Sequence, residues 1–319
     1  MRNTGIRKII VLGKNGLVLL GLVSVMFFSG CVENEVSAAE VENKLSAAEE
    51  IDTSFLLINS AESRIVSIRQ DIESGTYTTA KTSLKASKID FEEALKILND
   101  TSSDYEEENQ EIERYKTLAE SGLDRVSSLE SLLIAMEHFD KSFAYMYSEE
   151  FNLSKKELDK TNEALNDSAV SLNSAKEKVF TIDPNSVPVE QKSSIILLQD
   201  DLETSETMHV EVRKMINGMY PCMDGYECLS KGIEYGDVEK WDKAADEFEK
   251  ASNKFSESQK ILEKLKDSEY SEVSVGAIEM CGLLMKMQKD LPHFEAGCRY
   301  MEKGRYSQAQ KEFNKLSGF

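Results

Sequence analysis

Proline placement constrains the fold of this chain more than any other feature of its sequence. Four prolines occur in 319 residues, and all of them lie at or after Pro184. Residues 31–183 therefore contain no side chain that interrupts a helix by removing an amide N–H. No segment shows the alternation of apolar and polar residues that is typical of a half-buried strand. The sequence predicts an all-α fold.

Apolar residues recur every three or four positions from Ile51 onward, which is the spacing of one face of an α-helix. The clearest series runs through Val126, Leu129, Leu133, Met136, Phe139, Phe143 and Met146. The acidic stretch 104–113 precedes it. We interpret that stretch as a solvated helix start, where carboxylates favour the positive end of the helix dipole, rather than as a metal-binding cluster.

Three segments are expected to interrupt the helices. Two prolines lie within residues 184–188, and single prolines follow at Pro221 and Pro292. Because proline is disfavoured inside a helix, breaks are predicted at 183–188, 217–221 and 290–292. The first of these separates a predicted N-terminal helical domain, 51–183, from a C-terminal helical domain, 189–319.

The N-terminus has the layout of a signal peptide over residues 1–30. Basic residues precede an apolar run at 16–28, which is shorter than the roughly 20 residues that span a bilayer. Small residues at 29–30 lead directly to Cys31. This segment resembles the lipobox of a prokaryotic lipoprotein, bacterial or archaeal, although Phe28 stands where leucine is usual. The resemblance implies lipidation of Cys31; an ordinary signal peptide with an unmodified cysteine is the alternative.

A nine-residue duplication follows the predicted anchor, as residues 32–40 and 41–49. Nine residues make about 2.5 helical turns, so successive copies face opposite sides and cannot form one buried stripe. We interpret residues 31–50 as a lipidated, solvated tether.

The charge balance bears on the partners of the chain. Without the four basic residues of the signal segment, 34 basic side chains stand against 58 acidic ones. Such a body is repelled by nucleic acid and by anionic headgroups. We expect no nucleic-acid partner, and attachment to the membrane through the lipid. The predicted location is the outer face of the cytoplasmic membrane, in the cell envelope.

One local pattern occurs four times: an aromatic residue, a small residue three positions on, and a large apolar residue four positions after that. The small residue would let two antiparallel helices approach closely. The four sites begin at Tyr77, Phe151, Trp241 and Tyr306.

At the last two sites a glycine and a tyrosine also precede the aromatic residue. The sites comprise Gly232, Tyr235, Trp241, Ala244, Phe248 and Ala251, and then Gly297, Tyr300, Tyr306, Ala309 and Phe313. Their spacing resembles the tetratricopeptide repeat, a helix-turn-helix of about 34 residues. The resemblance implies antiparallel helical hairpins and a tetratricopeptide-like solenoid in the C-terminal half. The closing proline is absent, and the sites are 65 to 90 residues apart. For the N-terminal half a plain helical bundle is an equal alternative.

Four cysteines lie downstream of the anchor: Cys222, Cys228, Cys281 and Cys298. An even number in an exported chain favours disulfides. The pairs 222–228 and 281–298 are predicted, with buried unbridged thiols as the alternative. The spacings do not fit a zinc site.

No sequence motif indicates catalysis. The three histidines lie far apart, and no phosphate-binding loop or nucleophile motif occurs, so we expect no enzyme activity, cofactor or metal. The leading hypothesis is a lipid-anchored envelope scaffold that binds a protein or peptide through a helical-repeat groove. The alternative is a solute-binding or sensory lipoprotein with a small-molecule pocket between the two helical halves. Candidate groove residues are Glu227, Lys231, Glu234, Arg299 and Glu302.

Overall fold

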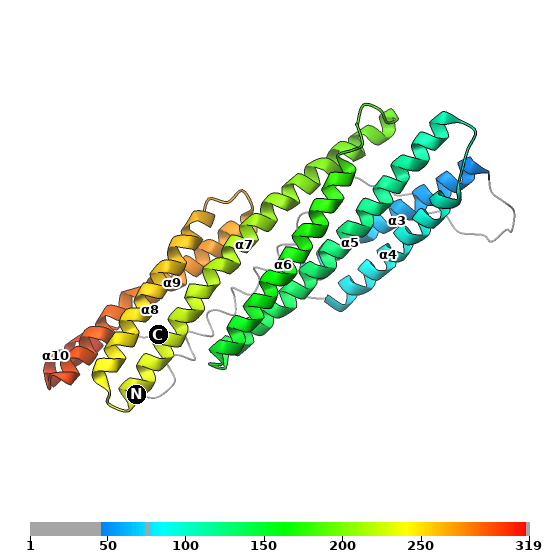
Figure 1. The fold of residues 1–319 in the computed structure, drawn as a ribbon. Helices are drawn as coiled ribbons and strands as arrows, with labels where there is room; N and C mark the ends of the chain where they lie inside the picture. Colours follow the sequence, from blue (N-terminus) through cyan, green and yellow to red (C-terminus); the bar gives the residue numbers. More distant parts are fainter. Residues whose placement is uncertain (1–45, 74–76, 317–319) are drawn as a thin grey trace. The chain divides into compact units, whose positions relative to one another are not determined.

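The computed structural model describes residues 46–73 and 77–316, and within these ranges the protein is all-α. Eight α-helices and one 3-10 helix occur there, without a strand, and successive helices pack largely as antiparallel neighbours (Figure 1). They are α3 (Ala47–Glu73), α4 (Tyr77–Asp100), α5 (Glu106–Tyr147), α6 (Phe151–Val179), α7 (Val189–Asp237), α8 (Trp241–Leu262), η3 (Glu263–Leu265), α9 (Ser271–Glu302) and α10 (Tyr306–Phe313). The prediction of an all-α fold of antiparallel helices is confirmed. The signal segment, Cys31 and residues 31–45 of the tether lie outside the described residues.

The first described helix begins with a reciprocal cap. The Ser46 amide donates to the Glu49 carboxylate at 2.8 Å, and the Glu49 amide donates to Ser46 Oγ at 3.4 Å. This arrangement satisfies two amides that the helix itself leaves without acceptors. The hydrogen bond from the Ser46 backbone, followed by that from its side chain, lowers the pKa of Glu49. The end of the predicted tether, residues 47–50, is thus already helical.

Helix α5 contains the long amphipathic series predicted between Val126 and Met146. All seven apolar side chains of that series are buried. The helix begins with Glu106, Glu107 and Glu108 in its first turn, as expected for carboxylates near the positive end of the dipole. The amphipathic prediction is confirmed.

Only the first of the three predicted breaks occurs. Residues 180–188 separate α6 from α7, and the Asp183 carboxylate accepts a hydrogen bond from the Asn185 amide at 2.8 Å. The breaks predicted at 217–221 and 290–292 are wrong, because Pro221 lies inside α7 and Pro292 inside α9. Apolar burial next to each proline compensates for the lost hydrogen bond: Cys222 and Met223 are completely buried, and Leu291 is nearly so.

The described chain forms two compact units, which do not follow the predicted domain boundary. The amino-terminal unit comprises residues 46–73, 77–134 and 164–209, and the carboxyl-terminal unit comprises residues 135–163 and 210–316. The predicted domains, 51–183 and 189–319, divide the chain once. The units instead divide α5, α6 and α7, because each of these long helices contributes one part to each unit.

Polar contacts join the helices of the amino-terminal unit. Ser87 Oγ on α4 donates to the Ala61 carbonyl on α3 at 3.1 Å. Arg125 on α5 is almost completely buried, and its Nη1 donates to Glu62 Oε1 at 2.6 Å. Because a buried guanidinium is costly without a partner, this ion pair fixes how α5 lies against α3.

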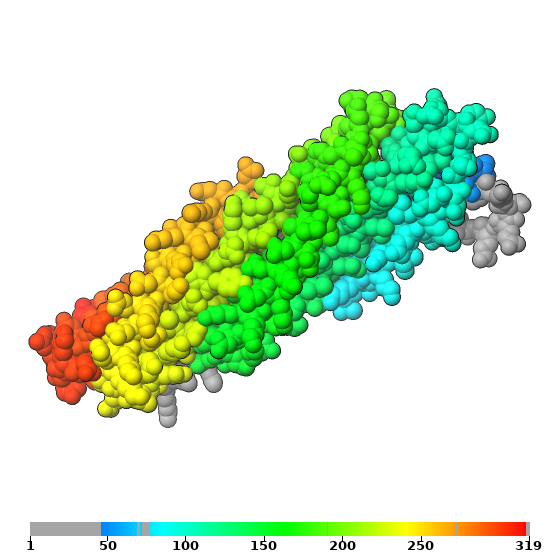
Figure 2. All heavy atoms as spheres, viewed as in Figure 1, coloured from blue at the N-terminus to red at the C-terminus, as the bar shows by residue number. Residues whose placement is uncertain are grey.

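A glycine series joins α7 to α8 in the carboxyl-terminal unit. Gly218, Gly225 and Gly232 recur every seven residues on α7, and they lie against Leu262, Phe255 and Phe248 of α8 respectively. A β-carbon at any of the three would lie within 3.0 Å of the opposing side chain. The two helices therefore approach more closely than side chains on both would permit. Figure 2 shows the side chains of α7 and α8 filling the space between them on the face displayed.

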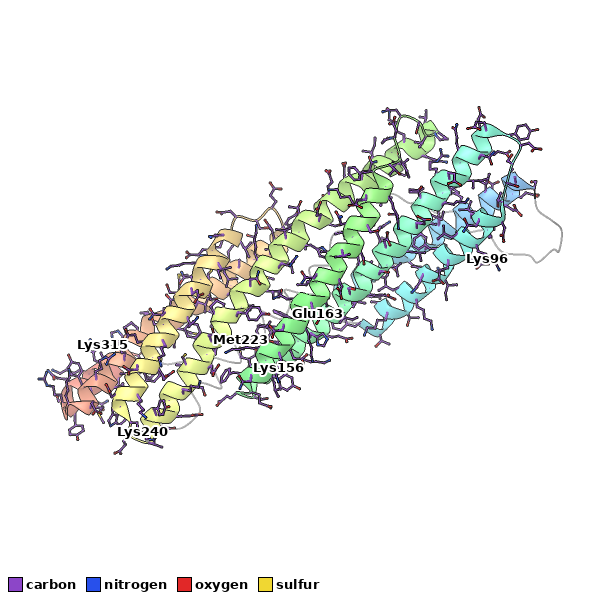
Figure 3. All side chains as sticks on the ribbon, viewed as in Figure 1. Lys96, Lys156, Glu163, Met223, Lys240 and Lys315 are labelled. Carbon is purple, nitrogen blue, oxygen red and sulfur yellow. The ribbon has the colours of Figure 1, made fainter. Side chains whose placement is uncertain are left out.

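Many of the charged side chains lie on the outward faces of the helices. Lys156, Lys240 and Lys315, labelled in Figure 3, are exposed, whereas Met223 is buried and accepts a hydrogen bond from Ser154 Oγ at 3.3 Å. Among the described residues, none of the helices is both long enough and apolar enough to span a bilayer.

Candidate functional site

A cavity of about 420 Å³ lies in the carboxyl-terminal unit, between the α5–α6 turn and α7. The turn and the start of α6 contribute residues 149–153. Helix α7 contributes Glu227, Ser230, Lys231 and Glu234, which lie on one face because they are three, four and seven residues apart. Three of the predicted groove residues, Glu227, Lys231 and Glu234, thus line one cavity.

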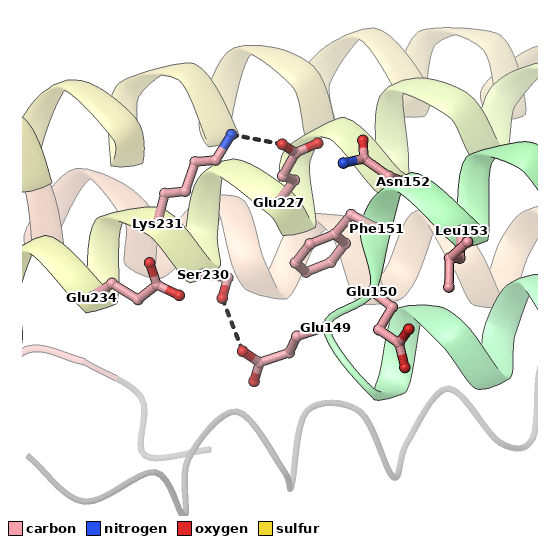
Figure 4. A pocket seen from close by; sticks show the side chains of 9 residues that line it. All are labelled: Glu149, Glu150, Phe151, Asn152, Leu153, Glu227, Ser230, Lys231 and Glu234. Atoms are coloured by element: carbon pink, nitrogen blue, oxygen red, sulfur yellow. Dashed lines mark hydrogen bonds and ion pairs between the residues drawn. The ribbon is translucent and has the colours of Figure 1, made fainter.

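Two interactions order the lining of the cavity (Figure 4). Lys231 Nζ lies 2.6 Å from Glu227 Oε1, and Ser230 Oγ donates to Glu149 Oε2 at 3.2 Å. Glu227 also accepts a hydrogen bond from Lys155 of α6 at 2.7 Å. The hydrogen bonds from Lys155 and then Lys231 lower the pKa of Glu227, while that from Glu227 raises the pKa of Lys231. Both groups are therefore charged at neutral pH.

The lining is strongly anionic, since four carboxylates face a single ammonium group. Lys231 and Lys155 neutralise Glu227. Glu150 and Glu234 make no ion pair with any described residue, and both side chains are exposed. The Phe151 ring is partly buried and provides an apolar surface in the lining of the same cavity. This combination suits a cation that carries an aliphatic chain.

The other two predicted groove residues lie elsewhere. Arg299 on α9 pairs with Glu295 of its own helix at 2.9 Å and with Glu249 of α8 at 3.1 Å. Glu302 is exposed near the end of α9. Neither lines the cavity. Arg299 instead joins α8 to α9, so the sequence placed it correctly on a helix surface but not in a groove.

Most of the predicted repeat-packing residues lie at contacts between helices. Ala244, Ala251 and Ala309 are completely buried, and Gly297 lies against the Phe313 ring as Gly232 lies against Phe248. Trp241, Tyr235 and Tyr300 are partly buried. Tyr306 differs, because 66% of it is exposed. It begins the short helix α10, where no described helix covers its outer side.

Three hairpins share one turn geometry, which the sequence had indicated only in part. Their turn residues, Glu149, Glu239 and Gly304, have φ values of 62°, 58° and 67°. In each hairpin the next residue donates its amide to a tyrosine carbonyl, over 2.8 to 2.9 Å. This is the Schellman motif, in which a left-handed residue ends a helix. The tyrosines are Tyr145, Tyr235 and Tyr300.

The same three hairpins also carry equivalent polar groups. Seven residues before the tyrosine stands His138, Cys228 or His293, and each contacts a glutamate on the following helix. The His138 Nδ1 to Glu157 distance is 2.6 Å, and the His293 Nδ1 to Glu312 distance is 2.9 Å. In all three hairpins the glutamate also pairs with the lysine three residues later. The three hairpins are therefore equivalent in their polar contacts as well as in their turn geometry.

A serine–histidine chain in the amino-terminal unit is the arrangement most like a catalytic site. Ser168 Oγ lies 2.8 Å from His209 Nε2 and 2.9 Å from Ser128 Oγ, and His209 Nδ1 lies 3.1 Å from the Ser205 carbonyl. A nucleophile and its base have such a separation. All four residues are buried, however, and Ser168 completely so. We assign the chain to the joining of α5, α6 and α7, because a substrate could not reach the hydroxyl from the surface.

The two predicted disulfide pairings are wrong on geometric grounds. Cys222, Cys228, Cys281 and Cys298 are all unbridged in the described structure. Because α7 is continuous, its two cysteines lie about 9 Å apart along the axis, beyond the roughly 7 Å that a bridge spans. Cys281 and Cys298 are likewise separated along α9. Burial raises the pKa of the Cys222 and Cys298 thiols to about 12.

Within residues 46–73 and 77–316, no three histidine, cysteine or carboxylate side chains are grouped so as to hold a metal ion. In comparisons with known proteins, no family model, curated protein or solved structure matches the chain. The chemistry of the cavity between the α5–α6 turn and α7 is therefore the basis for a functional assignment.

Proposed function

We propose that this protein is a non-catalytic scaffold of the cell envelope, lipid-anchored through Cys31, that binds a basic segment of a protein or peptide. The binding site in this proposal is the cavity between the α5–α6 turn and α7. The signal-like N-terminus and the small residues before Cys31 support the anchor. The choice of ligand rests on Glu150 and Glu234, whose carboxylates make neither an ion pair nor a hydrogen bond with a described residue, in a lining that also contains the Phe151 ring.

The hairpins support a scaffold built from tetratricopeptide-like units. Gly232 contacts Phe248 within the α7–α8 hairpin, and Gly297 contacts Phe313 at the equivalent positions of the α9–α10 hairpin. In helical-hairpin arrays of this kind, residues on the first helix of a hairpin commonly face the bound chain. Ser230, Lys231 and Glu234 lie on α7, which is the first helix of the α7–α8 hairpin.

The charge of the site selects the partner. A lysine or arginine side chain could pair with Glu150 or Glu234 and lay its methylene groups over Phe151. Each such solvent-exposed pair is worth at most about 1 kcal/mol, so one pair alone would bind weakly. A segment with several basic residues would gain two or more pairs, together with the attraction of a full chain of net charge −20.

Binding of a fluorescein-labelled hexalysine peptide to the full chain in detergent tests this proposal by fluorescence anisotropy. The double variant Glu150→Gln with Glu234→Gln should weaken binding about tenfold, the equivalent of two exposed ion pairs. The matched control, Glu269→Gln with Glu302→Gln, removes the same charge from exposed positions outside the cavity lining. It should change the affinity less than twofold. Equal losses in both variants, or no binding by the unsubstituted protein, would contradict the assignment.

A small-molecule function is the second candidate, because a volume of about 420 Å³ falls within the range of ligand cavities. The acidic lining would then select an amine. This cavity lies within the carboxyl-terminal unit, whereas the sequence-based alternative expected a small-molecule pocket between the two helical halves. Competition by spermidine separates the candidates. A solute-binding site predicts that spermidine displaces hexalysine at a lower concentration than an unlabelled basic peptide does.

A further inference from the structure

An apolar stripe on α9 has no partner among the described residues. It consists of Val275, Ile278, Gly282 and Met285, which recur at steps of three and four on one side of the helix. The three large side chains are 52%, 52% and 49% exposed. At Gly282, a β-carbon would meet no atom within 4 Å. We call these four residues the α9 stripe.

The stripe continues the face of α9 on which α10 packs. Gly282 and His293 lie eleven residues apart, about three turns, and so face nearly the same direction. His293 contacts Glu312 of α10, and Gly297 contacts Phe313. Helix α10 spans only Tyr306–Phe313, whereas α8 lies against α7 from Gly218 to Gly232. Within the described chain, the first two-thirds of this α9 face therefore lacks the antiparallel helix that the end of the face has.

Charges beside the stripe indicate what could occupy it. Glu279 precedes Gly282 by three residues and Lys286 follows it by four. Both side chains are exposed, and neither pairs with a described residue. If a second copy of α9 ran antiparallel about Gly282, Glu279 would lie beside the partner's Lys286, and the reverse pair would form as well. A parallel arrangement would instead place each of these residues at the same level along the axis as its own copy, so neither pair of opposite charges would form.

We propose that the α9 stripe is the interface of an antiparallel homodimer whose twofold axis passes near Gly282. The missing side chain at Gly282 lets the two backbones approach, as glycines do against α8 in the hairpin of the same unit. Ile278 then packs beside the partner's Met285, and Val275 packs against the aliphatic part of the partner's Lys289. A membrane surface is a poorer occupant, because Glu279 and a net charge of −20 are repelled by anionic headgroups.

Reversing the charges of Glu279 and Lys286 in the full chain tests this interface. Sedimentation velocity in detergent measures the dimer dissociation constant of each variant. Glu279→Lys and Lys286→Glu should each raise the dimer dissociation constant about tenfold, because each creates two repulsive contacts across the axis. The double variant should return it to within about threefold of the original value, because both pairs are then restored with reversed sign. Failure of the double variant to recover would overturn the proposal. So would a monomer at all concentrations tested, which would mean that another segment covers the stripe.

Disulfide trapping fixes the direction of the two helices. Gly282→Cys should give a reductant-sensitive dimer after mild oxidation in membranes. Glu302→Cys should not, because in the antiparallel arrangement the two substituted positions lie about 60 Å apart along the axis. A dimer from Glu302→Cys at the level of Gly282→Cys would contradict the arrangement. The unsubstituted chain supplies the background from its own cysteines.

Discussion

Phe248 lies so close to Gly232 that a β-carbon at position 232 would be 2.7 Å from its Cε1 atom. The two residues belong to α7 and α8, and the same relation recurs one heptad away, between Gly225 and Phe255. Backbone on one helix and aromatic rings on the other thus form the seam of this hairpin. The seam is densely packed because the glycines of α7 have no side chains and the rings of α8 fill that space, and not because both helices contribute large residues.

Gly232→Ala should lower the free energy of unfolding by roughly 1–3 kcal/mol, because the added methyl group forces Phe248 to move within a packed seam. Urea denaturation measures the loss. Gly236→Ala is the matched control on the same helix, since its β-carbon would meet Trp241 at an ordinary 3.8 Å. This control should be neutral or stabilising, because alanine favours helix over glycine by about 1 kcal/mol. Equal behaviour of the two variants would contradict the close approach of α7 and α8.

Glu239→Gly should stabilise the protein by roughly 0.5–1 kcal/mol, since Glu239 has a φ of 58° and left-handed backbone is costly for a side chain with a β-carbon. Thermal unfolding measures the gain. The reverse change, Gly304→Ala at a φ of 67°, should destabilise by about 1 kcal/mol. No atom lies within 4 Å of a β-carbon at Gly304, so the loss of stability in Gly304→Ala reports the cost of the backbone conformation alone. A loss of stability in Glu239→Gly would show that this turn differs from the turn at Gly304.

Thiol titration should find Cys222, Cys228, Cys281 and Cys298 all reactive in the unfolded, unreduced protein, because none of them is bridged. In the folded protein at neutral pH, Cys222 and Cys298 should react slowly, since burial raises their pKa values to about 12 and excludes the reagent. Labelling followed by peptide mass analysis assigns each thiol. Fewer than four labelled thiols after unfolding would mean that an oxidised form exists.

Acid should weaken the contact of Glu227 with Lys155 and Lys231. The pKa of Glu227 in the folded protein is below its ordinary value of 4.5, so its stabilising effect is complete above pH 4.5 and is lost as the pH falls through the lowered pKa. Glu227→Gln should cost about 1 kcal/mol at pH 7 and much less near pH 3. Urea midpoints at both values measure the difference, with the exposed Glu302→Gln as control. A cost that does not change with pH would assign Glu227 a packing role instead.

The local pattern of apolar residues and prolines predicted the helices well. The apolar spacing from Val126 to Met146 predicted α5, and the two prolines in residues 184–188 predicted the end of α6. The same reasoning was wrong at Pro221 and Pro292. The low helix propensity of proline describes the local backbone only and does not include the burial of neighbouring side chains. Burial of Cys222 and Met223 against neighbouring helices outweighs one missing hydrogen bond. The predicted pairings 222–228 and 281–298 were also wrong, because a continuous helix holds the two cysteines of each pair apart.

The candidate site could be predicted only in part. Glu227, Lys231 and Glu234 were selected because they lie on the exposed side of a first helix, and they line the cavity. Glu149 and Glu150 were missed, since they lie about 80 residues earlier, and only the pairing of α6 with α7 brings them there. That pairing depends on long-range contacts, such as Lys155 with Glu227, that no local pattern reveals.

Site-specific photo-crosslinking in cells tests whether the cavity binds a basic segment. A benzoylphenylalanine residue in place of Asn152, which lines the cavity, should give a discrete crosslinked product. Mass analysis should locate the crosslink within a lysine- or arginine-rich segment of the partner. The yield should fall severalfold when Glu150→Gln and Glu234→Gln are added, but not with Glu269→Gln and Glu302→Gln. A product of unchanged yield in the cavity variant, or a crosslink to an acidic or apolar segment, would contradict binding of a basic segment in this cavity.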